Sequence, residues 1–127
     1  MKSIEEIATE LVDSSFKIHK ELGPGLLESA YETCLDYELT KRGFTVERKV
    51  PQPLIYEEIA IDAGYRLDLL INGLVIIELK AVEQLAPIHT AQLLTYLKLS
   101  KRTLGFLINF NTPLIKHGIK RIANNHP

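Results

Sequence analysis

The chain has 127 residues, of which 46% are hydrophobic and 24% charged, and its formal net charge is −1. These values predict one globular domain, residues 1–127, and the longest apolar runs reach only strand length, which excludes a membrane span. The N-terminal sequence MKSIEEIATELV is too acidic for a signal peptide. Cys34 is the only cysteine, so an internal disulfide and a cysteine-cluster zinc site are excluded, and we expect a cytoplasmic protein.

Charge is distributed unevenly along the chain. Residues 1–83 contain nine basic and sixteen acidic residues, whereas residues 84–127 contain six basic residues and no acidic one. The near-neutral total argues against indiscriminate binding of nucleic acid, but the C-terminal third could form a local surface that attracts phosphate. A solvated face is an equally good interpretation of these residues, which are Lys98, Lys101, Arg102, Lys116, Lys120 and Arg121.

Two helices are predicted at the N-terminal end. Ser3 and Glu6 have the spacing of a capping box, and the helix they start should end near Leu22, because Gly23-Pro24-Gly25 follows. A second helix is expected over residues 26–42. A period of 3.6 residues predicts that the first helix buries Ile4, Ile7, Ala8, Leu11, Val12, Ser15, Phe16 and His19. The inward residues of the second helix are Leu27, Ala30, Tyr31, Cys34, Leu35 and Leu39.

The rest of the chain is predicted to form strands and one more helix. Apolar runs indicate strands, Pro87 opens the helix, and Gly118 favours a strand over a helix in the tail. The expected strands are residues 44–50, an extended segment 54–61, the two halves of residues 64–82, residues 104–110 and residues 114–123, and the helix covers about residues 88–100. This order of elements predicts an α+β or mixed α/β fold.

The stretch GYRLDLLINGLVIIELKAV, residues 64–82, reads as two strands joined at Asn72-Gly73. The second strand is almost entirely aliphatic, which indicates burial on both faces. Asp68, Glu78 and Lys80 nevertheless lie in this hairpin, and buried charges cost several kcal/mol unless they are paired or bind a metal. A functional site explains the three charges best, and a buried ion-pair network is the alternative.

The connection at Asn72-Gly73 decides whether these charges can meet. A two-residue turn would pair Ile71 with Leu74 and would place Asp68 and Glu78 on opposite faces of the sheet. A three-residue or bulged connection, with the glycine in a left-handed conformation, would place all the charges on one face. We predict this second arrangement, because a shared metal requires it.

Asp68, Glu78 and Lys80 together suit metal-assisted hydrolysis of a phosphodiester. Two carboxylates on one face can hold a hard divalent cation such as Mg²⁺ through their oxygens. Such a cation lowers the pKa of a bound water and stabilises charge on the phosphate. Lys80 lies two residues beyond Glu78 on the same face, where it can orient or deprotonate that water.

Three further residues could serve the same site. Glu28 lies in the first turn of the second helix, where the helix dipole favours a carboxylate even without any catalytic role. Gln92 and Tyr96 are four residues apart on the third helix and therefore share a face. Gln92 could bind the site or a phosphate. Tyr96 could lie beside a base, although packing in the core is its plainer role.

Three motifs, in this order along the chain, resemble a known family. Residues 25–31, GLLESAY, read as GxxExxY, the signature of the GxxExxY proteins. Asp68 followed by Glu78-Leu79-Lys80 resembles the core of the PD-(D/E)xK nuclease superfamily, in which those proteins are grouped. Gln92 to Tyr96 is similar to the QxxxY motif of the RecB-like branch. One departure is Leu67, which stands where the superfamily's name has a proline.

The resemblance implies a restriction-endonuclease-like core, with a mixed central β-sheet flanked by helices. The implied ligands of Mg²⁺ or Mn²⁺ are Glu28, Asp68, Glu78 and the backbone carbonyl of Leu79, and the implied catalytic residues are Asp68, Glu78 and Lys80. Candidate substrate-binding residues are Gln92, Tyr96, Lys98, Lys101 and Arg102. The implied function is metal-dependent hydrolysis of DNA. The alternative is a catalytically silent module that binds nucleic acid or a partner protein, and a homodimer or such a partner could supply DNA recognition.

Overall fold

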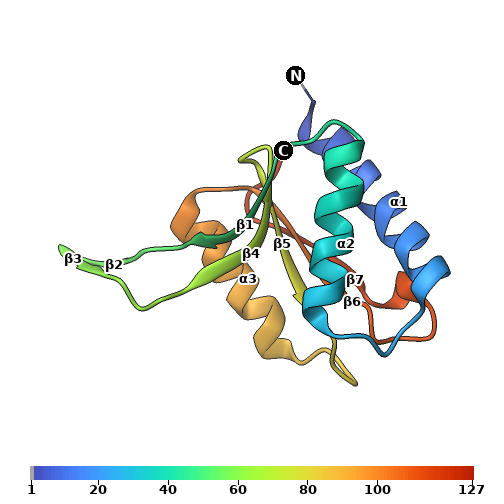
Figure 1. Ribbon diagram of the computed structural model, residues 1–127. Helices are drawn as coiled ribbons and strands as arrows, with labels where there is room; N and C mark the ends of the chain where they lie inside the picture. Colours follow the sequence, from blue (N-terminus) through green and yellow to red (C-terminus); the bar gives the residue numbers. More distant parts are fainter. Residues whose placement is uncertain (1) are drawn as a thin grey trace.

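The computed structural model describes residues 2–127, and its centre is a mixed sheet of five strands in the order β1-β4-β5-β6-β7. Helices α1 and α2 cover one face of this sheet and α3 covers the other (Figure 1). The predicted mixed sheet flanked by helices is therefore confirmed. The helices are α1 (Ile4–Leu22), α2 (Glu28–Lys41), α3 (Pro87–Ser100) and the short 3-10 helix η1 (Ile115–His117). The strands are β1 (Val46–Pro51), β2 (Leu54–Tyr56), β3 (Ile59–Ile61), β4 (Arg66–Ile71), β5 (Val75–Lys80), β6 (Leu104–Asn109) and β7 (Ile119–Ala123).

Strand β5 is the middle of the sheet. It pairs antiparallel with β4 and parallel with β6, and α3 provides the crossover that a parallel pair requires. Its side chains pack into two separate cores, one under α1 and α2 and one under α3, so its predicted burial on both faces is confirmed. Gly105 of β6 lets α3 approach closely, because a Cβ atom there would lie 3.0 Å from Leu93.

Helix α1 begins as predicted, with Ser3 and Glu6 forming the capping box. Its buried stripe is shifted at the C-terminal end, where Ile18 is buried and Phe16 is 42% exposed. Two residues apart on a helix point about 200° from each other, so only one of these side chains can face the core. The expected burial of Phe16 is therefore wrong.

The start of α2 is fixed by Tyr31. The Tyr31 hydroxyl donates a hydrogen bond to the Gly23 carbonyl at 2.6 Å and accepts one from the Leu26 N–H at 3.1 Å. The Tyr31 ring is fully buried and stacks on Phe110, with centroids 4.4 Å apart. Leu27 precedes the first helical turn with an extended backbone and is 76% exposed, so its predicted burial is wrong.

The segment predicted as one extended stretch, residues 54–61, is instead a hairpin of two short strands. Strands β2 and β3 pair only with each other and form a second, two-stranded sheet. The turn between them contains Glu57, which adopts φ 53°. The hairpin projects from the domain beyond the β1–β4 edge (Figure 1).

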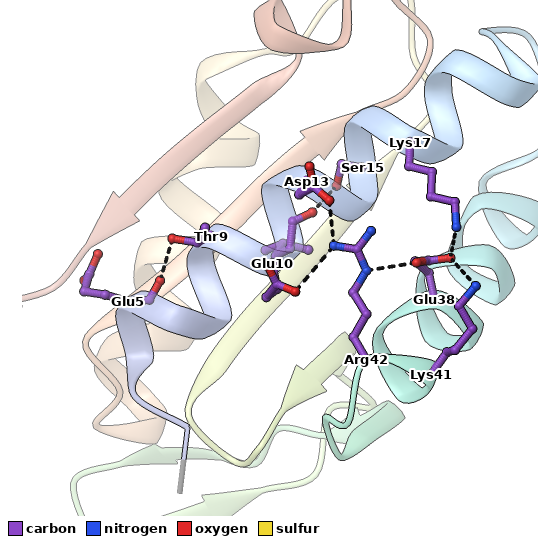
Figure 2. A network of polar contacts seen from close by, with 10 residues as sticks. Glu5, Thr9, Glu10, Asp13, Ser15, Lys17, Glu38, Lys41 and Arg42 are labelled. Carbon is purple, nitrogen blue, oxygen red and sulfur yellow. Dashed lines mark hydrogen bonds and ion pairs between the residues drawn. The ribbon is translucent and has the colours of Figure 1, made fainter.

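An ion-pair network joins α1 to α2. Its centre is Glu38, which accepts hydrogen bonds from Arg42 Nε at 2.9 Å and Lys17 Nζ at 3.0 Å (Figure 2). Arg42 also donates to Asp13 at 2.7 Å. These contacts fix the packing of the two helices that cover this face of the sheet.

No helix within residues 2–127 is long and apolar enough to cross a membrane. The tail forms strand β7 only after Gly118, because residues 115–117 form the 3-10 helix η1, so the strand expected over residues 114–123 is confirmed for its second half alone.

We expect Tyr31→Phe to lower the free energy of unfolding by about 1–2 kcal/mol, because it removes one donor and one acceptor from a buried loop contact. Urea denaturation would measure this change. Tyr37→Phe is the matched control, since Tyr37 is 67% exposed on the same helix. Equal effects of the two substitutions would contradict the role of the Tyr31 hydroxyl.

We expect Glu38→Gln to lower the free energy of unfolding at neutral pH by about 1–2 kcal/mol. The hydrogen bond from Arg42 is the main cause that lowers the pKa of Glu38 to about 2, from an ordinary value of 4.5. A carboxyl group with a lowered folded-state pKa stabilises the protein above its ordinary pKa, and this stabilisation is lost as the pH falls toward the folded-state value.

Urea denaturation across the acid range should therefore give stability curves for Glu38→Gln and the wild type that converge as the pH falls from about 5 to about 2. Glu47→Gln, at an exposed position of β1, controls for the loss of a carboxylate as such. Curves that stay parallel would contradict the lowered pKa.

Candidate active site

The connection between β4 and β5 has the length that brings the acids together. The strands pair Ile71 with Val75, so three residues form the loop. Asn72-Gly73 adopts left-handed conformations, with φ 52° and 68°. This confirms the predicted three-residue connection, and the same register carried down the strands sets Asp68 opposite Glu78.

Regular pairing of β4 with β5 stops just before these acids, at Leu69 and Ile77. Beyond this point, backbone N–H groups donate to side-chain carboxylates and not to backbone carbonyls of the neighbouring strand. The Leu79 N–H donates to Asp68 Oδ2 at 2.8 Å, and the Asp68 N–H donates to Glu78 Oε1 at 3.4 Å. The two strands diverge toward this end of the sheet (Figure 1). The carboxyl groups therefore lie in the opening between the strands and are held there by backbone donors.

The pairing of β4 with β1 is interrupted at the same level, where Lys49 and Asp68 would lie opposite each other. Lys49 has φ 53°, a left-handed conformation that is uncommon for a residue with a side chain. Its ammonium lies 3.5 Å from Asp68 Oδ1 and 3.0 Å from Glu32 Oε1. Asp68 is thus released from regular pairing on both sides, and a lysine lies next to it.

Burial and mutual repulsion dominate the electrostatics of the acid pair. Glu78 is 5% exposed, and its burial, followed by the charge of Asp68, raises its pKa to about 9. Burial also raises the pKa of Glu28, and the charge of Asp68 adds to this effect. The positive charge of Lys80 opposes both increases. The site therefore contains more carboxyl groups than its lysines neutralise.

Helix α2 supplies two acids to this region. Glu28 is its first residue, placed there by the loop that Tyr31 closes. Glu32 follows one turn later, is almost fully buried, and binds Arg48 at 2.9 Å as well as Lys49. The sequence analysis missed Glu32 and Lys49. The spacing of Glu28 and Glu32, four residues on one helix face, was a signal that could have found the first of these.

Helix α3 places Tyr96 close to the acids. Tyr96 is 6% exposed, and burial, followed by the charge of Glu78, raises its pKa. Its ring lies 6.1 Å from that of Tyr65, which is 42% exposed just before β4. Tyr96 thus has the predicted core position and also borders the site. Gln92 is exposed one turn earlier on the same helix.

The basic residues predicted to bind substrate lie elsewhere. Arg102 Nε donates to the Gly73 carbonyl at 2.9 Å, at the turn end of the hairpin that is opposite to the acids. Lys101 caps α3 next to it. Lys98 is exposed two residues after the buried Tyr96 and so points to the opposite side of α3. These three residues therefore do not lie beside the acids, where Lys49 and Lys80 provide the positive charge, and their binding of substrate stays a prediction.

The oxygen donors of Asp68 and Glu78 fit a hard divalent cation, and a cation bound there would offset the burial and the repulsion by Asp68 that raise the pKa of Glu78. Within the described residues 2–127, no three His, Cys, Asp or Glu side chains lie close enough to form a metal site as they stand. The participation of Glu28 and of the Leu79 carbonyl stays a prediction, as does the identity of the metal.

The mixed sheet of five strands flanked by helices is consistent with a nuclease core of the restriction-endonuclease type. A family model described as the PD-(D/E)XK nuclease superfamily matches residues 5–122. The chain therefore belongs to this superfamily, whose nucleases usually use divalent metal ions. No curated protein and no solved structure matches the chain significantly. The narrower GxxExxY and QxxxY assignments stay predictions.

In buffer with a metal chelator, we expect Glu78→Gln to gain about 5 kcal/mol of stability relative to the wild type as the pH rises from about 5 to about 9. Unfolded Glu78 loses its proton near its ordinary pKa of 4.5, whereas folded Glu78 keeps it to about 9. The wild type therefore loses stability over this range, and the glutamine variant does not.

Urea denaturation across the pH range would measure this difference between Glu78→Gln and the wild type. Glu83→Gln, at an exposed position shortly after β5, is the control. A difference between Glu78→Gln and the wild type that does not vary with pH would show that the pKa of Glu78 is not raised.

Proposed function

We propose that this protein is a metal-dependent nuclease that hydrolyses phosphodiester bonds in DNA. The observation that carries the proposal is the pair of Asp68 and Glu78, held by backbone N–H groups in the opening between two strands. Buried carboxyl groups in contact are costly in a core, and two such groups beside a lysine suit metal-assisted hydrolysis. Membership of the nuclease superfamily supports the same chemistry.

A bound divalent cation would lower the pKa of a water and neutralise charge on the scissile phosphate. Asp68 and Glu78 would each supply a carboxylate oxygen, and the ligand set would be completed by Glu28 and the Leu79 carbonyl. The Leu79 N–H and Lys49 would keep the Asp68 carboxylate in position, since both already contact it.

Lys80 would orient the attacking water from the same face of β5 as Glu78. The water oxygen would lose a proton to solvent and form a bond to phosphorus, while the bond from phosphorus to the departing sugar oxygen breaks and that oxygen takes up a proton from solvent. Gln92, exposed on α3, would contact the substrate. Tyr65, which is partly exposed beside Tyr96, offers a ring on which a base could stack.

We expect the wild type to cleave plasmid and single-stranded DNA when Mg²⁺ or Mn²⁺ is present. Asp68→Ala and Lys80→Ala should each lower the rate by about 100-fold or more, because each removes a group required for chemistry. Lys116→Ala, which changes an exposed lysine on η1, is the matched control and should keep full activity. Parallel reactions with RNA would define the substrate class.

Equal cleavage by the wild type, Asp68→Ala and Lys80→Ala would point to a contaminating nuclease. DNA binding that weakens steeply with salt, with no cleavage by any variant, would identify a silent binding module instead. A metal-binding readout separates these cases: Mn²⁺ should raise the melting temperature of the wild type and not that of Asp68→Asn.

A further inference from the structure

The hairpin of strands β2 and β3, residues 54–61, is here named the arm. It forms its own two-stranded sheet and extends away from the rest of the domain (Figure 1). A two-stranded hairpin alone is marginally stable in water at best. The arm therefore needs a surface to pack against.

Large apolar side chains cover the arm and are exposed. Ile55, Tyr56 and Ile59 are each at least 60% exposed, and Ile61 is 38% exposed. In a short strand, side chains alternate between faces, and one apolar face is normally buried. Here Tyr56, Ile59 and Ile61 share one face and are exposed together, whereas Ile55 lies on the other face, and an exposed apolar face of this kind is typical of an interaction surface.

The arm carries negative charge, which determines the kind of partner that it can bind. Glu57 and Glu58 form its tip and Asp62 follows directly, while residues 54–65 contain no lysine or arginine. A surface with this charge repels phosphate, so nucleic acid does not suit it. An apolar surface edged with lysines suits it.

The outer face of α3 is such a surface. Ile88, Ala91, Thr95 and Lys98 are exposed, and their helical spacing places them on one side, away from the buried Leu93 face. The helix contains no acidic residue, and Lys98 and Lys101 lie at its C-terminal end. The chain thus contains two complementary surfaces, one acidic and apolar and one basic and apolar.

We propose that the arm binds the outer face of α3 of a second copy of this chain, and that the second arm makes the same contact in return. A two-fold arrangement forms each contact twice, which increases the buried area toward the roughly 1,200–2,000 Å² of stable interfaces. Tyr56, Ile59 and Ile61, which share one face of the arm, pack against Ile88 and Ala91, while the acids at the tip face Lys98 and Lys101.

Charge reversal tests this arrangement by sedimentation equilibrium. The wild type is expected to be a dimer. The arm variant Glu57→Lys/Glu58→Lys and the helix variant Lys98→Glu/Lys101→Glu should each dimerise at least about 10-fold more weakly, because like charges then face each other. In an equimolar mixture of the two variants, both contacts become complementary again, so a heterodimer should form.

The control is Lys116→Glu, which reverses an exposed charge outside both surfaces and should leave the dimer intact. Circular dichroism and melting curves of every variant establish that it is folded. A monomeric wild type, or two variants that fail to associate when mixed, would overturn the proposal. Unchanged dimerisation with weakened DNA binding in the helix variant would overturn it as well and would assign α3 to nucleic acid.

Discussion

Asp68 and Glu78 meet at the point where the β4–β5 ladder has ended, and the geometry of this contact constrains the surrounding structure. In a regular ladder the Leu79 N–H would bind a backbone carbonyl of β4. It binds the Asp68 carboxylate instead, and the Asp68 N–H turns to Glu78. Two backbone N–H groups thus bind carboxylates at the point where the ladder ends. A buried acid pair of this kind lowers the stability of the fold, which indicates that it serves a function.

The elements around the acid pair compensate for it in different ways. Lys49 adopts a left-handed backbone conformation and contacts Asp68, while Glu32 holds that lysine from the other side. Glu32 can do so because α2 lies at a fixed position, and Tyr31 fixes that position through its hydroxyl and its stack on Phe110. The GxxExxY segment therefore has a structural role that can be read from its contacts, separate from any role of its acid in binding metal.

Structural features that depend on residues close together in sequence could be predicted. Features that depend on contacts between residues far apart in sequence could not. The register of the hairpin was predicted from the even spacing of its charges and from the geometry that a shared metal requires, because Asn72-Gly73 by itself also allows a two-residue turn. The contact of Lys49 with Asp68 could not be predicted, because the two residues are 19 apart in sequence and lie on different strands. The end of the β4–β5 ladder could not be predicted either, because it depends on how side chains bind the backbone of the neighbouring strand. The turn at Glu57 was missed because neither glycine nor proline marks it. Arg102 was misplaced because a basic composition does not say where each side chain binds.

The distribution of charge along the chain affects how a nuclease with this site would bind DNA. The C-terminal basic residues are partly engaged elsewhere, with Arg121 bound to Glu5 at 2.8 Å and Arg102 bound to a turn carbonyl. Near the acids, burial keeps Glu78 protonated at neutral pH and Lys49 contacts Asp68, so the site without a cation offers little attraction to a phosphate backbone. A divalent ion would add positive charge there. Binding of metal and binding of DNA would then reinforce each other, and by linkage each would increase the affinity for the other by the same factor.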